Sequence, residues 1–104
     1  MNNTRVEKVK AMLAKSPDDT FLLYALAMEY KKTDQPQSLE LLRRVIQLDP
    51  LQSYAYFQLG QVHELSGDAE AAKETYRQGV TAAGRAGDEH AKHEIAAALA
   101  AIED

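Results

Sequence analysis

The 104-residue sequence contains no cysteine, which excludes disulfides, thiol chemistry and a cysteine-ligated metal site. No apolar run approaches the roughly 20 residues that a membrane-spanning helix needs. The first residues lack the basic and then apolar pattern of a signal peptide. We therefore expect a cytoplasmic protein with a single domain and no membrane partner.

Catalytic motifs are also missing from the sequence. It has no nucleophile elbow, no phosphate-binding loop and no constellation of paired carboxylates. His90 and His93 can share one helix face, with Glu94 beside them, but the sequence specifies no third ligand of the kind that a metal site needs. His63 fits a hydrogen-bonded residue of a packed helix better than a catalytic base. We therefore expect no enzymatic activity, cofactor, metal ion or small-molecule substrate.

A surplus of positive charge is absent as well, since the net charge is −4. Residues 1–48 carry eight Lys and Arg against six Asp and Glu, whereas residues 49–104 carry four against ten. A protein that binds nucleic acid normally presents a basic face, because phosphate contacts dominate its affinity. We therefore expect no nucleic-acid partner. The uneven charge is compatible with a basic partner segment or head-to-tail self-association, but ordinary solvated faces are the better explanation.

What the sequence does contain is a strong helical pattern. Tyr56, Leu59, Gly60 and His63 fall at i, i+3, i+4 and i+7, so they form one stripe of a helix. A glycine inside a helix costs about 1 kcal/mol relative to alanine. We therefore expect a neighbouring helix to approach closely at Gly60.

A sharp turn and a second helix follow this stripe. Gly67 can adopt the left-handed conformation that ends a helix, and Asp68 can cap the next helix with its carboxylate. The second helix has an apolar stripe from Ala69 to Ala83. Because the connection is short, the two helices should lie antiparallel.

Several residues of this hairpin match the spacing of a known repeat: Tyr56, Leu59, Gly60, His63, Ala72 and Tyr76. In this pattern the segment resembles the tetratricopeptide repeat (TPR) family, in particular its small bacterial-type members. The resemblance implies an all-α fold, a short right-handed solenoid, and a non-catalytic module for protein–protein interaction. Two positions depart from the family pattern. His63 replaces the usual tyrosine, and Gly84 replaces a helix-ending proline, so the second helix can continue past it.

A further copy of the pattern precedes this one by 33 residues, with Leu23, Leu26, Ala27 and Tyr30 at the equivalent positions. We therefore expect about six helices within one TPR domain. Its parts are a half-repeat helix at residues 1–17, repeat one at 19–50, repeat two at 51–84, and a capping helix at 87–104.

The first helix of repeat one carries a second apolar stripe, about 200° around the helix from the first. The resemblance implies that such positions in the first helix of each repeat line a concave face and meet a peptide or a helix of a partner. We therefore predict an adaptor or scaffold with a protein-binding groove. The residues of this groove are Phe21, Tyr24, Met28, Tyr54, Phe57, Gln58 and Gln61. The two glutamines would bond to the backbone of a bound segment.

Two alternatives remain open for this stripe. It can simply belong to the core, because burial is the usual fate of residues such as Phe21 and Phe57. It can also form a homodimer interface, because short repeat stacks have incompletely covered ends. A clamp for a C-terminal carboxylate is not expected. Chaperone-binding members of the family use Lys and Asn at positions occupied here by Tyr24 and Met28, among others.

Overall fold

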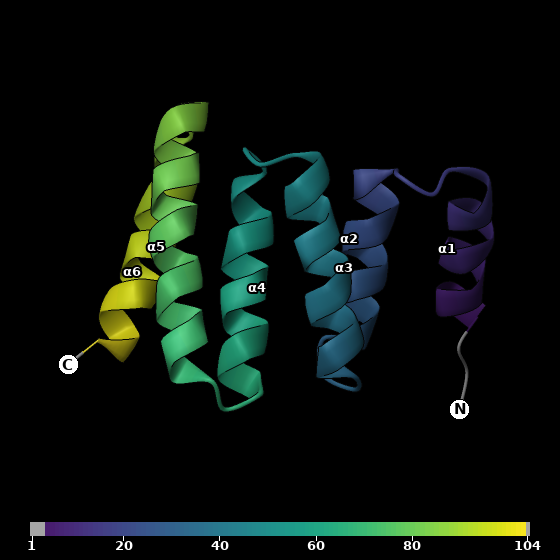
Figure 1. Ribbon diagram of the computed structural model, residues 1–104, viewed down its shortest axis with the longest axis horizontal. Helices are drawn as coiled ribbons and strands as arrows, with labels where there is room; N and C mark the ends of the chain where they lie inside the picture. Colours follow the sequence, from purple (N-terminus) through teal and green to yellow (C-terminus); the bar gives the residue numbers. More distant parts are fainter. Residues whose placement is uncertain (1–3, 104) are drawn as a thin grey trace.

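The computed structural model describes residues 4–103, and these form a row of six helices with no strand among them (Figure 1). Each helix packs against the next one along the chain, and the whole measures 41 × 29 × 18 Å. The predicted all-α repeat fold is thereby confirmed. The helices are α1 (Thr4–Lys15), α2 (Thr20–Tyr30), α3 (Gln35–Leu48), α4 (Ser53–Leu65), α5 (Ala69–Ala86) and α6 (Glu89–Ile102).

An aspartate begins four of the six helices. In each case the side chain accepts a hydrogen bond from the backbone N–H three residues later, which satisfies a donor that the first helical turn leaves free. These capping residues are Asp19, Asp34, Asp68 and Asp88. Gly67, which precedes Asp68, has a φ of 82°, so it adopts the left-handed conformation predicted for it. Sharp turns of this kind hold consecutive helices side by side.

The end of helix α5 depends on which residue stands at position 84. Helix α5 continues through Gly84 and ends at Ala86, and the left-handed residue is Gly87, with a φ of 72°. No proline stops the helix at position 84, so its backbone hydrogen bonds continue until the chain turns at Gly87 and Asp88. Helix α5 thus continues past Gly84, as the missing proline allowed.

The core follows the row of helices as three clusters of buried side chains. Residues of α2, α3 and α4 form two of them, and residues of α5 and α6 form the third, with Phe57 of α4 packed against it. The members are Ala27, Leu42, Leu59 and Val62 in the first cluster, Leu23, Val45 and Ala55 in the second, and Ala72, Tyr76 and Ile95 in the third. Both repeats thus bury the stripe that the family spacing marks, except for Tyr30 of repeat one, which is half-buried.

Helices α4 and α5 approach each other closely at two glycines. A Cβ atom at Gly60 would lie 2.2 Å from Cε1 of Tyr76, and one at Gly79 would lie 2.7 Å from Cβ of Tyr56. No side chain fits at either position without displacing a buried ring or its backbone. The close approach expected at Gly60 is therefore confirmed, and it explains why a poor helix former is tolerated there.

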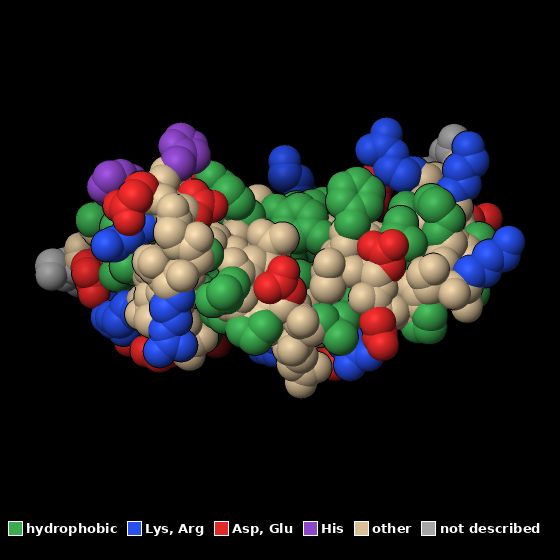
Figure 2. All heavy atoms as spheres, turned by 90° about the horizontal axis from the view of Figure 1, so that it is seen from above, with side chains coloured by type: hydrophobic (Ala, Val, Ile, Leu, Met, Phe, Trp, Pro, Cys, Tyr) green, Lys and Arg blue, Asp and Glu red, His purple; other side chains and the backbone are tan. Residues whose placement is uncertain are grey.

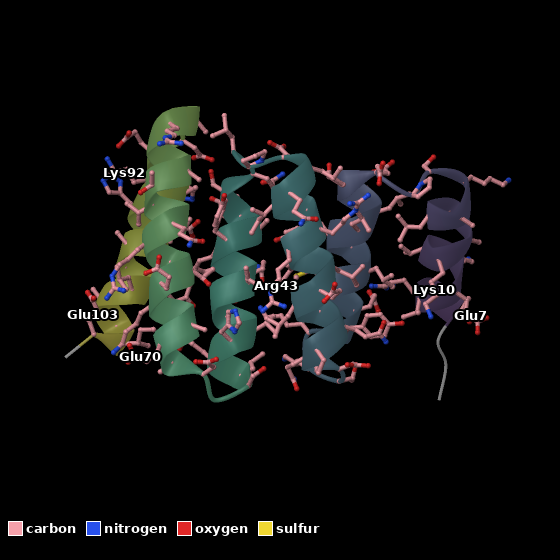
Figure 3. All side chains as sticks on the ribbon, viewed as in Figure 1. Glu7, Lys10, Arg43, Glu70, Lys92 and Glu103 are labelled. Carbon is pink, nitrogen blue, oxygen red and sulfur yellow. The ribbon has the colours of Figure 1, made fainter. Side chains whose placement is uncertain are left out.

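His63 lies near the end of α4 with only 8% of its surface exposed. Burial lowers the pKa of its imidazole, and the positive charge of Arg43 lowers it further, whereas Asp68 acts in the opposite direction. Figure 3 shows Arg43 reaching from α3 toward α4. His63 is therefore held in its neutral form more firmly than a free histidine would be.

We expect acidification to destabilise the protein through His63. Because its pKa is lower in the folded state, the unfolded chain binds more protons below the ordinary pKa of about 6.5. The free energy of unfolding should therefore fall as the pH drops from about 6.5 through the folded-state pKa, and it should be unaffected by this group above that range. Urea unfolding at several pH values between about 8 and 5 measures the slope. A His63→Gln variant should have a smaller slope, and an unchanged slope would contradict the assignment.

Candidate protein-binding face

Helices α2, α4 and α6 present side chains to one common surface, which we call the α2/α4/α6 face. In Figure 1, α2 lies behind α3 and α6 lies behind α5. Helix α4 contacts α6 directly, and side-chain hydrogen bonds join α2 to α4. Figure 2, seen from above, shows hydrophobic side chains gathered along the upper edge, which is this face.

An apolar depression of about 360 Å³ opens between the first turns of α2 and α4. Its lining consists of Thr20, Phe21, Tyr24, Gln52 and Tyr54. Phe21 is 78% exposed, so its ring belongs to no core cluster. An aromatic side chain this exposed beside two half-buried tyrosines makes a patch that another apolar group can cover.

Tyr54 connects α4 to α6 at the edge of this depression. Its hydroxyl donates a hydrogen bond of 2.8 Å to Oε1 of Glu94. This bond raises the pKa of Tyr54 to about 12, with smaller contributions from burial and from the charge of Glu94. The Tyr54 ring also meets Phe57 edge to face, with centroids 6.5 Å apart. The position of the ring is thus fixed from two sides.

A second depression, of about 480 Å³, lies where α2 and α4 end. Its lining consists of Lys31, Lys32, Gln61, Glu64 and Leu65. The ammonium of Lys31 donates hydrogen bonds of 2.7 Å to the Oε1 atoms of both Gln58 and Gln61. Burial lowers the pKa of Lys31, and the charge of Lys32 lowers it further. The face is therefore apolar at one end and cationic at the other.

The seven residues predicted to line the groove fall into four groups. Phe21 and Tyr54 line the apolar depression, and Phe21 is exposed where burial is usual for phenylalanine. Tyr24 lines the same depression and also packs against two core clusters. Burial raises the pKa of Tyr24, and a side-chain hydrogen bond with Gln58 partly offsets this rise. Met28 and Phe57 pack against core clusters. Gln58 and Gln61 both accept from the same lysine.

Sequence reasoning missed two residues of this face. Lys31 follows the end of α2 and had no assigned role, because its two partners lie 27 and 30 residues away. The sequence placed Glu94 only beside two histidines, yet its carboxylate accepts a hydrogen bond from Tyr54, 40 residues away. The 33-residue repeat period, which relates α2 to α4, was the available signal for Lys31, whereas no such period pointed to Glu94.

The histidines of α6 have no metal-binding arrangement among residues 4–103. Nε2 of His90 lies 3.5 Å from Oε1 of Glu94, but no group of three or more His, Cys, Asp or Glu side chains in this part of the chain could hold a metal ion. Within the same residues, no helix has the length and apolar character needed to cross a membrane.

Comparisons with known proteins agree with this geometry. The family model for the tetratricopeptide repeat matches residues 53–84. The TPR repeat-containing protein PA0015 of Pseudomonas aeruginosa is 31% identical over 91 residues, which cover 86% of this chain and 87% of that protein. This chain belongs to the tetratricopeptide repeat family. TPR domains generally serve as protein–protein interaction modules and non-catalytic scaffolds, so a role in binding proteins is the general expectation for this TPR protein.

Two solved structures resemble the TPR stack. Protein BPP2914 from Bordetella parapertussis superposes with a TM-score of 0.83 at 28% identity, covering 98% of this chain and 89% of that one. A tetratricopeptide repeat domain protein from Salinibacter ruber gives a TM-score of 0.78 at 32% identity, covering 84% of this chain and 89% of that one. The likeness extends over all or most of the helices described above.

Proposed function

We propose that this TPR protein is a non-catalytic adaptor that holds a segment of another protein against its α2/α4/α6 face. The observation that carries the proposal is the exposed ring of Phe21 beside Tyr24 and Tyr54. A phenylalanine in contact with water contributes nothing to the core. Covering this side chain with a partner should stabilise the complex by about 1.5–3 kcal/mol.

The size of the face sets the expected strength of binding. The apolar depression is shallow and small, and the two tyrosines beside it are already partly buried. We expect an interface confined to this depression to bury less than the roughly 1,200 Å² of stable complexes. We therefore expect a weak, reversible interaction that depends on a few aromatic contacts.

Replacing Phe21 with serine should abolish binding without unfolding the protein. Because the side chain is exposed, the free energy of unfolding should change by less than about 0.5 kcal/mol. Peptides can be selected from a random library on the immobilised wild-type protein, and their affinities compared for wild type and Phe21→Ser by fluorescence anisotropy.

Leu51→Ser is the matched control for this experiment. Leu51 is also an exposed apolar residue, at 46%, but it lies in the turn between α3 and α4 and lines neither depression. The control variant should bind like the wild type. Equal loss in both variants, or no loss in Phe21→Ser, would reject the proposed face.

A homodimer through the same face is the rival function. Sedimentation equilibrium over a wide concentration range distinguishes the two. A monomer that binds selected peptides supports the adaptor. A dimer that Phe21→Ser dissociates, and that Leu51→Ser leaves intact, would make the face an assembly surface instead.

A further inference from the structure

Lys31 is held in place without being neutralised. Two of its three ammonium donors bond to the amide oxygens of Gln58 and Gln61, which carry no charge. Neither Lys31 nor its neighbour Lys32 forms an ion pair within 4 Å among residues 4–103. The positive charge therefore stays available to a ligand, in a fixed position and with part of its solvation already removed.

One acidic residue, Glu64, lines the same depression. Oε2 of its carboxylate accepts a hydrogen bond from the hydroxyl of Tyr76, so that oxygen is engaged with α5. Two lysines against one glutamate leave this end of the face with a surplus of one positive charge. It differs in this respect from the chain as a whole, whose net charge is −4.

The separation between Phe21 and Lys31 sets a length for the ligand. The two residues are ten positions apart along α2 and its end, which corresponds to about 15 Å at 1.5 Å per residue. An extended chain covers about 3.3 Å per residue. Four or five residues of an extended segment therefore span the distance from the apolar depression to the ammonium group.

An extended segment fits this face better than a helix does. The Nε2 group of Gln61 remains a donor after its Oε1 has accepted from Lys31. An extended backbone offers carbonyl groups to such a donor, whereas a helix uses its carbonyl groups internally. The donor lies beside the cationic end, where the acidic residue of the ligand would arrive.

On the basis of the adaptor function proposed above, we propose that the α2/α4/α6 face selects an extended, acidic segment of a partner protein. In this segment an Asp or Glu side chain lies four or five residues from a large apolar side chain. The apolar side chain covers Phe21, and the carboxylate accepts a hydrogen bond from the remaining N–H group of the Lys31 ammonium. The acidic group belongs to a side chain within the segment, so no free chain terminus is required.

The test is a selection from random segments of about twelve residues, displayed inside a loop of a carrier protein so that none has a free carboxyl terminus. The full chain is the bait, as wild type, Lys31→Gln, Phe21→Ser and Lys15→Gln. Lys15→Gln is the control because it removes the same charge from the last turn of α1, a helix that lies away from the face. Sequences selected by wild type and Lys15→Gln should combine a large apolar residue and an acid four or five positions apart.

Affinity measurements on the selected segments complete the test. Changing the acid to its amide should weaken binding to wild type about tenfold, and Lys31→Gln should have the same effect but add nothing once the acid is gone. Selected segments that need Phe21 but show no acid at this spacing would overturn this inference and leave the adaptor function standing. An acid and an apolar residue about eleven positions apart would also overturn it, because that spacing indicates a helix. Segments whose binding ignores Phe21 would reject the adaptor face itself.

Discussion

Replacing Tyr76 with alanine is expected to lower the free energy of unfolding by about 4 kcal/mol, as large-to-small changes of buried aromatic residues do. The ring is fully buried between α4 and α6. It lies against the backbone of Gly60, and its centroid is 6.4 Å from that of Phe57. Glycine has no side chain that could move into the vacated space, so the cavity should persist. Urea unfolding followed by circular dichroism measures the change.

Tyr76→Phe separates the ring from its hydroxyl. The hydroxyl donates to Glu64, and burial together with this bond raises the pKa of Tyr76 well above its usual value. Losing a single hydrogen bond should cost only about 1 kcal/mol. A phenylalanine variant as unstable as the alanine variant would mean that the hydroxyl, and not the packing of the ring, is what the fold requires.

Gly60→Ala is expected to lower the free energy of unfolding by about 2 kcal/mol, although alanine is the better helix former. The added methyl group would lie 2.2–2.7 Å from three atoms of the Tyr76 ring. The ring has no free space to retreat into, so α4 and α5 must separate. Thermal unfolding and urea unfolding should both show the loss.

Gly84→Ala provides the matched control, because it is the same chemical change within a helix. Apart from its two chain neighbours and the nearby backbone of α5 itself, no atom of the described residues lies within 4 Å of the Cβ position at Gly84. The variant should gain about 0.5–1 kcal/mol from helix propensity alone. Opposite signs for the two alanines are the expected result. A gain at both positions would show that the α4–α5 contact is looser than the distances indicate.

The hairpin around Gly60 could be predicted from sequence because its signals are local. A glycine inside an apolar stripe, a Gly-Asp turn and an alanine-rich second helix each act over a few residues. Their physical causes are steric and capping effects that do not depend on distant parts of the chain. The same reasoning identified Asp68 as a cap, and its carboxylate does accept the expected hydrogen bond from the backbone N–H of Ala71.

The character of the candidate site could not be read in this way. The periodicity of α2 placed Phe21 and Met28 on one stripe, yet Phe21 is exposed and Met28 packs against the core. A stripe gives the direction of a side chain but not how far the neighbouring helix extends to cover it. Partners such as Lys31 and Gln61 are fixed by how the two repeats stack, which no single helix encodes.

The N-terminal helix α1 makes the local stability of the stack uneven along its length. Its one buried side chain among the described residues is Val9, and its packing is with α2. In a linear array each helix is stabilised mainly by its nearest neighbours. Helix α1 is therefore the element that can open while α4, α5 and α6 remain cooperative as one unit. Because α2 carries Phe21 and leads directly into Lys31, the proposed binding face borders the helix that we expect to open with the least free energy.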